Sequence, residues 1–337
     1  MANSATGGLW GQNSLVRYGA VRLATAVLVL IGSMALLCAL TLIVPGDPAT
    51  VLLGPRASPQ TVAVFREQMG LNLPLYERVF VFFFRALQGD LGVDVLTSRP
   101  VAGLVMAALP NTLLLALSAI GLAVAVGVPI GCYAAVRPGS LLDQALAVLS
   151  VSLVATPSYV VGILLLYFFS LKLGWFPVLG AGTAGNFLDQ LHHLVLPALA
   201  LSVGWIGYIA RLVRSSLLEV LGEPFIRTAR AYGQPETRVV GKYALKLACI
   251  PTVAILGVGI GELMGGAVFV EIIFNRPGLG SLIFDAIKNR NYPIVQGGIL
   301  VVVAIFVLAN LLVDLSYAWL DPRVRENLGK AGTGGAG

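Results

Sequence analysis

The sequence predicts an all-α polytopic membrane protein with six transmembrane helices, and three observations carry this prediction. The 337 residues are 57% hydrophobic and only 11% charged, whereas soluble domains carry about 25% charged residues. Apolar runs long enough to cross about 30 Å of hydrocarbon recur along the chain. Lys and Arg gather in alternate connections between these runs. The net charge of +6 therefore indicates membrane topology and not nucleic-acid binding.

The first predicted span covers about Val21 to Val44 and follows Arg17 and Arg22. Basic residues before a first span favour a cytoplasmic N-terminus. A cleaved signal peptide is the alternative interpretation, and its apolar region would cover about 7–15 residues. This run is longer and ends at the segment Pro45–Pro48. We therefore interpret it as a membrane anchor.

Residues 45–103 form the one sizeable polar insertion, which we expect on the extracytoplasmic side. Two helices are predicted within it, because Pro suits the first turn of a helix and Gly suits its end. The first runs from Pro59 to Gly70 with Ser58 as its cap, and the second from Pro74 to Gly89. The apolar run Phe80–Phe84 in the second is too short to span. This helix should pack against the spans or lie at the membrane interface.

Five further spans follow the insertion, at about Leu109–Val136, Leu146–Leu171, Leu194–Ile209, Ala248–Phe269 and Ile294–Leu320. Six spans place both termini on one side of the membrane, which the distribution of Lys and Arg makes the cytoplasm. The Gly- and Ala-rich tail, residues 326–337, has the composition of a disordered segment.

The cytoplasmic loop 215–246 contains the longest polar interruption in the second half of the chain. Pro224 suits the first turn of a helix, and Gly233 suits its end. Pro235 with Glu236 can then open another helix. The first helix has an apolar and a cationic side, formed by Phe225, Ala229 and Tyr232 and by Arg227 and Arg230. A docking element and a solvated connection between two spans are both compatible with this pattern.

The fifth span repeats Gly257, Gly261 and Gly265 at four-residue spacing. Small residues on one helix face allow close approach of another helix. That helix could belong to this chain, or to a partner subunit along a translocation pathway. Glu262 lies beside the same face, and an ionisable group at membrane depth is costly. It should therefore face a polar cavity or a partner group.

Several classes of chemistry have no matching motif in the sequence. It contains no phosphate-binding loop of the G-x-x-x-x-G-K-[ST] type. The three cysteines lie scattered in apolar runs, and adjacent His192 and His193 would point about 100° apart on a helix. No Ser/His/Asp or H-E-x-x-H set lies within the spans. The sequence therefore predicts no catalytic residue, no metal site and no cofactor.

The order of short motifs along nearly the whole chain resembles the permease subunits of bacterial dipeptide/oligopeptide ABC importers, which have the type I transmembrane fold. The matching segments are Pro45–Pro48, Gly89–Gly92, Pro110, Thr112, His193–Ala198, Arg214–Ser216, Ile226–Gly233, Ile250, Pro251, Glu271, Pro277–Gly280, Tyr292–Gly297 and Asn310–Asp314. Leu247 departs from the family, which usually has Asn at that place.

The resemblance implies one permease domain over residues 1–337 in the bacterial inner membrane. It implies half of a translocation pathway for di- or oligopeptides, glutathione, opines or nickel complexes. The implied partners are a second homologous permease subunit, two ATP-binding subunits that hydrolyse ATP, and an extracytoplasmic solute-binding protein.

The segment I-R-T-A-R-A-x-G resembles this family's cytoplasmic EAA loop, a coupling helix that docks on the ATPase subunit. The resemblance therefore assigns ATPase coupling to Phe225, Arg227, Thr228, Ala229, Arg230, Ala231 and Gly233. It assigns no role to Glu262. A secondary transporter with its own ion coupling is the alternative function, and it would need ionisable residues distributed over several spans. Few such residues are present.

Overall fold

The computed structural model describes residues 7–43, 57–68 and 72–320. Within these residues the chain is helical, and the only β-type pairing is an isolated bridge between Val93 and Pro100. Some sequence-based predictions lie outside the described residues. They are the disordered tail 326–337, the first part of the insertion and the helix end at Gly70.

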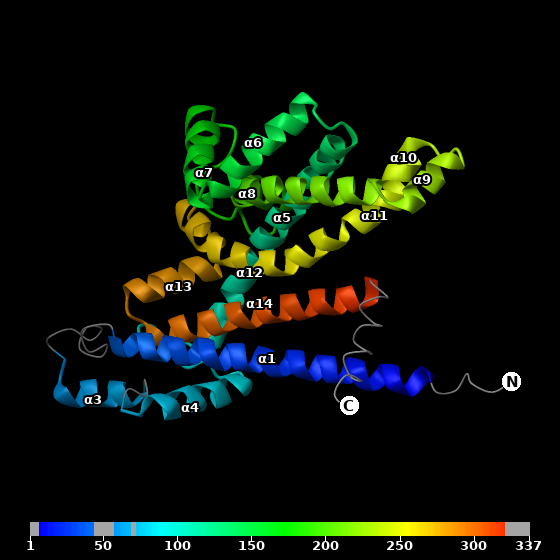
Figure 1. Cartoon of the computed structure of the whole chain (residues 1–337). Helices are drawn as coiled ribbons and strands as arrows, with labels where there is room; N and C mark the ends of the chain where they lie inside the picture. The colour runs from blue at the N-terminus through cyan, green and yellow to red at the C-terminus, as the bar shows by residue number, and fades with distance from the viewer. Residues whose placement is uncertain (1–6, 44–56, 69–71, 321–337) are drawn as a thin grey trace. The chain divides into compact units, whose positions relative to one another are not determined.

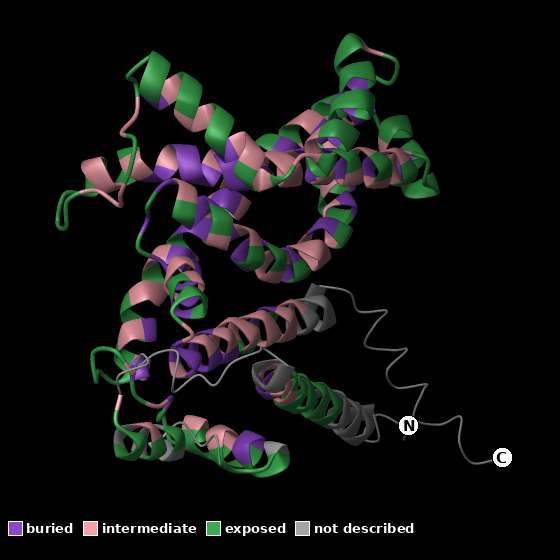
Figure 2. Cartoon of the chain, turned by 90° about the vertical axis from the view of Figure 1, so that its left-hand side faces the viewer, coloured by how far each residue is buried: buried purple, intermediate pink, exposed green. Residues whose placement is uncertain are grey.

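The chain forms two compact units, residues 1–104 with 286–337 and residues 105–285. In the first unit, α1 (Gly7–Ile43) runs along α4 (Leu75–Leu87) and α14 (Tyr292–Leu320) (Figure 1). Much of the described surface of α1 is exposed (Figure 2). An apolar helix with so little cover needs lipid or another protein around it.

The insertion contains the two predicted helices, α3 (Pro59–Gln68) and α4. Val79 of α4 is buried with Met34 and Cys38 of α1. The opposite side of α4 leaves Phe80 73% exposed. Of the two predicted positions for this helix, the structure thus shows packing against a span.

The second unit is built around α8 (Phe187–Leu221), which packs with α5 (Val101–Val136) and α12 (Ile250–Ile273). In the most apolar stretch of α8, 56% of the residues are buried, against 28% in α5. The shared core contains Leu115, Ala119, Leu201, Leu263, Ala267 and Phe274. Consequently α8 is the central helix of this unit.

Glycines allow the neighbours of α8 to approach its backbone closely. A Cβ atom on Gly131 of α5 would lie 2.5 Å from the carbonyl oxygen of Ala210, nearer than any real contact. On Gly207 of α8, a Cβ atom would lie 3.1 Å from the Cα of Ser150. Substitution at Gly131 would therefore push α5 and α8 apart.

The predicted continuous third span is wrong, because two helices occupy that stretch. They are α6 (Leu141–Ala155) and α7 (Ser158–Leu165), and α7 continues as the π-helix η1 (Leu166–Lys172). The axes of the two halves differ by 99°. Pro157 has no N–H to donate, and Thr156 before it adopts an extended backbone with ψ 119°. The helical hydrogen bonding therefore stops at Thr156.

Five described helices are long and apolar enough to cross a membrane, and the bent pair makes six if it counts as one span. The predicted number of spans agrees with this total. Four short helices follow α8: α9 (Pro224–Ala231), α10 (Glu236–Arg238), the π-helix η2 (Val239–Ala244) and α11 (Leu245–Ala248). A further helix, α13 (Leu279–Lys288), follows α12 and precedes α14 along the chain. This helix was not predicted from the sequence.

Candidate functional site

The short helix α9 begins and ends where the sequence predicts. Pro224 occupies its first turn, and Gly233 has a left-handed φ of 72° just beyond its end. The N–H of Gly233 donates to Arg230 O at 2.9 Å, and the N–H of Gln234 donates to Ala229 O at 3.2 Å. This pair of hydrogen bonds is the Schellman arrangement, which satisfies the last carbonyls of a helix.

Ile226 fixes α9 to the rest of the second unit. Its side chain is fully buried in a cluster with Ala135, Leu217, Val239, Ala244 and Ala248. The helical spacing in the sequence predicts an apolar side of Phe225, Ala229 and Tyr232, which does not include Ile226. Of those three, Ala229 packs against the cluster, whereas Phe225 is 41% and Tyr232 is 79% exposed. The helix is therefore anchored on one side and presents two aromatic side chains on its surface.

The two cationic residues of α9 differ in their surroundings. Arg227 is exposed. Arg230 forms a two-point ion pair with Glu236, with its Nη2 2.7 Å from Oε1 and its Nε 3.2 Å from Oε2. The hydrogen bonds from Arg230 hold the pKa of Glu236 below its usual value and raise the pKa of Arg230. The ion pair of Arg230 with Glu236 therefore stabilises the turn between α9 and α10.

The other predicted coupling residues complete the exposed surface of α9. The Thr228 hydroxyl donates to Pro224 O at 3.1 Å, a bond within the helix. Ala231 is exposed. A Cβ atom on Gly233 would meet nothing within 4 Å. The requirement for Gly there comes from its φ and not from crowding.

An ion pair fixes α6 to α8. Arg214 Nη2 donates to Asp143 Oδ2 at 2.9 Å, and Arg214 Nε donates to Oδ1. The N–H of Gly139 donates to the same Asp143 Oδ2 at 2.9 Å. The Asp143 carboxylate thus accepts hydrogen bonds both from the turn before α6 and from the last third of α8.

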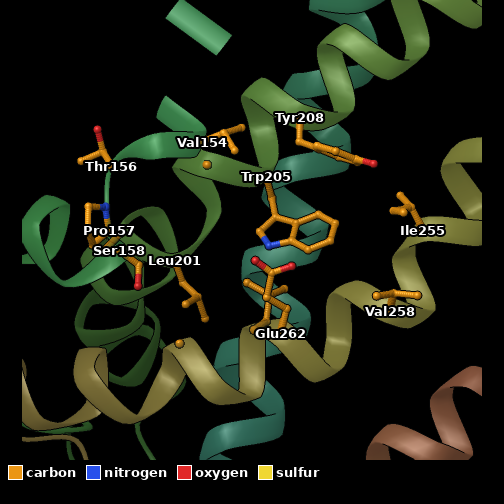
Figure 3. Close-up of a pocket in the computed structure, with 14 residues that line it drawn as sticks. Val154, Thr156, Pro157, Ser158, Leu201, Trp205, Tyr208, Ile255, Val258 and Glu262 are labelled. Carbon is orange, nitrogen blue, oxygen red and sulfur yellow. The ribbon is translucent and has the colours of Figure 1, made fainter. Parts of the chain in front are cut away.

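A cavity of about 420 Å³ lies in the second unit, between the break of the third span, α8 and α12. Thr156 and Ser158 line it from the break, Trp205 and Tyr208 from α8, and Glu262 from α12. Figure 3 shows the Glu262 carboxylate directed toward the indole of Trp205. Among the described residues that line the cavity, Glu262 is the only charged one. Glu262 thus faces a cavity of this chain whose wall is mainly apolar, with the hydroxyl groups of Thr156, Ser158 and Tyr208 in its lining.

The three glycines of the predicted stripe differ in burial, and they do not form the close approach between α12 and Trp205 of α8. Gly257 is buried and Gly261 is half-buried, while Gly265 is exposed, and a Cβ atom on Gly265 would meet nothing within 4 Å. The close contact involves a neighbouring glycine, because a Cβ atom on Gly259 would lie 2.5 Å from the Trp205 ring. Gly259 therefore makes the space in which the indole sits beside Glu262.

A buried polar cluster at the end of α12 received no predicted role. Glu271 is fully buried. Its Oε1 accepts a hydrogen bond from the Thr112 hydroxyl at 2.5 Å, and its Oε2 accepts one from the Ser281 N–H at 2.9 Å. In the sequence, Glu271 and Thr112 are each a polar residue within an apolar run, and that is the only sign of a buried polar pair. Nothing in the spacing indicated that they meet.

The glycines of the Pro277–Gly280 segment allow this cluster to form. A Cβ atom on Gly278 would lie 2.1 Å from Glu271 Oε1, and one on Gly280 would lie 2.7 Å from the Cα of Val268. Both distances are shorter than the 3.0 Å below which real Cβ atoms essentially never approach another atom. Only glycine at these two positions lets the chain cover the carboxylate.

Comparison with known proteins identifies the class. Residues 127–326 match the family model "Binding-protein-dependent transport system inner membrane component". Residues 15–116 match the model of its N-terminal component. The described helices also match a solved structure of the inward-facing MetNI methionine ABC transporter, with a TM-score of 0.53 and 20% identity over 65% of this chain and 96% of that one. The fold is that of the transmembrane subunit of a type I ABC importer.

Curated proteins with a related sequence align with most of the chain, as two of them illustrate. The "Probable peptide ABC transporter permease protein y4tP" of Sinorhizobium fredii is 42% identical over 89% of this chain and 96% of its own length. The "Glutathione transport system permease protein GsiC" of Escherichia coli K12 is 39% identical over 83% and 90%. The chain therefore belongs to the family of inner-membrane components of binding-protein-dependent transport systems. It is a multi-pass permease subunit of an ATP-driven importer.

Proposed function

We propose that this permease subunit forms half of the translocation pathway for di- or oligopeptides, glutathione included, and is driven through α9. The peptide class is supported by relatives whose names describe peptide and glutathione permeases. The use of α9 is supported by its geometry, because Ile226 anchors the helix while Phe225 and Tyr232 remain exposed. An anchored helix with exposed aromatic side chains suits a protein partner.

In this proposal the chain itself neither binds nor hydrolyses ATP. Of the two ATP-binding subunits, one contacts α9 from the cytoplasm, where both termini also lie. A second homologous permease subunit completes the pathway, and an extracytoplasmic binding protein delivers the solute. ATP can change the state of the permease only if the ATPase contacts α9 differently in its two states.

Reconstitution of the four kinds of subunit in vesicles tests the function. Labelled trialanine or reduced glutathione, supplied with the binding protein, should accumulate only when ATP is available to the ATPase subunits. Accumulation should persist when a protonophore removes the ion gradient. Uptake that needs the ion gradient and not ATP would overturn the proposal in favour of a secondary transporter.

A charge exchange separates the two possible roles of Arg230. The variant R230E breaks the pair with Glu236 and should lower substrate-stimulated ATP hydrolysis. The double variant R230E/E236R restores a pair of opposite charges across the turn. Recovery of hydrolysis in the double variant would show that Arg230 acts by holding the turn. Continued loss would assign Arg230 a direct contact with the ATPase.

Arg227 is exposed on the same helix and forms no ion pair with a described residue, so R227E leaves the Arg230–Glu236 pair in place. If α9 docks on the ATPase, R227E should weaken assembly with that subunit, measured by co-purification at increasing salt. Normal co-purification and normal hydrolysis in both R227E and R230E would remove α9 from the mechanism.

A further inference from the structure

The cavity beside Glu262 has the features of a ligand site within the permease subunit. Its volume, about 420 Å³, falls in the range of about 300–1,000 Å³ typical of small-molecule sites. Its walls combine apolar side chains with the hydroxyl residues Thr156 and Ser158 and the carboxylate of Glu262. A few polar groups on a mainly apolar wall are what orient a small ligand.

The carboxylate of Glu262 has no hydrogen-bond or ion-pair partner among the described residues, and the side chain is exposed to the cavity. Because a carboxylate accepts hydrogen bonds and donates none, its natural complement is a cation with N–H groups. A divalent metal would need further ligands. No group of three His, Cys, Asp or Glu side chains suited to a metal lies in the described part of the chain.

The indole of Trp205 faces this carboxylate, and a second aromatic ring packs against the indole. Trp205 and Tyr208 pack edge to face, with their ring centroids 5.7 Å apart. In Figure 3 the Glu262 carboxylate from α12 lies next to the Trp205 indole from α8. An aromatic face attracts an ammonium group within about 6 Å of the ring centre, and Trp does so best. Carboxylate and indole together favour an organic ammonium group.

We propose that this cavity binds the free amino group of the transported peptide, with Glu262 as its counter-charge and Trp205 as its aromatic platform. The inference rests on the proposed peptide transport and adds a selective site inside the membrane subunit. Acetylation of the peptide's amino group removes the positive charge. The site should then lose its preference for that peptide.

Uptake by the assembled transporter in vesicles is the first test. The probes are trialanine, reduced glutathione and their N-acetyl forms. With E262Q, uptake of the free-amine probes at low concentration should fall on the order of tenfold. Co-purification of the subunits with E262Q checks that the complex still assembles. D285N is the matched control, because Asp285 is an exposed acid of the same unit that does not line the cavity.

Direct binding to the assembled complex, without the binding protein, removes the selectivity of that protein from the measurement. With Trp10, Trp175 and Trp319 replaced by Phe, the part of the complex's fluorescence change that the further substitution W205F removes comes from Trp205 and reports on the cavity. Free-amine probes should change it in a saturable way, and E262Q or acetylation of the probe should weaken binding by a similar factor. In the uptake assay, W205F should retain more activity than W205L, because Phe keeps an aromatic face.

The outcomes separate the two proposals. If the wild-type transporter takes up none of the probes, peptide transport is wrong and this inference fails with it. If the wild type transports them and E262Q does so equally well, only the inference fails. Loss of complex assembly in E262Q would make Glu262 a structural residue and would also overturn the site. Equal loss of free and acetylated probes would do the same.

Discussion

Thr112 uses one hydroxyl group for two hydrogen bonds in opposite directions. The hydroxyl donates to Glu271 Oε1 at 2.5 Å and accepts from the Leu279 N–H at 2.7 Å. Asn111 beside it donates to Pro277 O at 2.7 Å. Two neighbouring residues of α5 thereby hold the segment that connects α12 to α13. Because Thr112 is buried, water cannot replace these bonds at low cost.

The substitution Thr112→Val keeps the shape of the side chain and removes its hydroxyl. One hydrogen bond to Glu271 and one acceptor for the Leu279 N–H are then lost, which should cost about 1–3 kcal/mol. We expect a lower thermal unfolding temperature of the purified complex and no change in α9 coupling. Thr112→Ser retains the hydroxyl and is the matched control. Equal stability of the Val and Ser variants would show that the hydroxyl contributes nothing.

Sequence reasoning found some residues of the candidate site and missed others for a physical reason. Glu262 was identifiable because a charge inside an apolar run is costly by itself. Trp205 was not, because an aromatic residue in an apolar helix is ordinary core composition. Only the packing of α8 against Gly259 brings Trp205 to Glu262. The contact between Thr112 and Glu271 likewise depends on tertiary packing.

At the scale of elements, local chemistry predicted helix ends well and predicted breaks poorly. Pro224 and Gly233 bracket α9 as expected, since both act through their own backbone. The break at Pro157 was missed because proline alone does not decide it. Pro110 and Pro129 lie inside the continuous helix α5, and Pro197 lies inside α8. Surrounding helices determine whether a proline bends or ends a span.

The end of α9 gives a test of backbone conformation alone. Gly233 has a φ of 72° and open space around its missing side chain. A β-branched residue there costs about 1–2 kcal/mol or more through its backbone conformation, whereas Asn tolerates the left-handed region better. Gly233→Val should therefore lose substrate-stimulated ATP hydrolysis, and Gly233→Asn should retain most of it.

Both Gly233 variants should reach the membrane, which immunoblotting of membrane fractions can check. The assay compares ATP hydrolysis with and without loaded binding protein. Equal stimulation in the Val and Asn variants would show that the conformation of this turn has no part in coupling.

At the scale of the whole molecule, the number of spans followed from composition, and the family likeness supports the fold. Long apolar helices need little tertiary information to be recognised. The ten-residue helix α13 was missed because a short amphipathic stretch between two spans has no distinct hydropathy signal. The orientation of the chain in the membrane stays a prediction from its Lys and Arg distribution.

Single cysteines test that orientation in a background in which Cys38, Cys132 and Cys249 are replaced. A cysteine at Ser58 should react with a membrane-impermeant thiol reagent added to intact cells from the outside. A cysteine at Glu236 should react only after the membrane is opened. The reverse pattern would place α9 outside the cell and would exclude contact with a cytoplasmic ATPase.

The length of α8 has a mechanical consequence. Its 35 residues correspond to about 52 Å, and the helix carries Trp205 partway along and leads into α9 at its end. Its internal proline, Pro197, lies on the far side of Trp205 from α9. The stretch between Trp205 and α9 has no proline hinge, and Arg214 braces it against α6. The stretch of α8 from Trp205 to Leu221 is therefore one continuous helix held against α6, and we expect a displacement of its α9 end to move Trp205 with it.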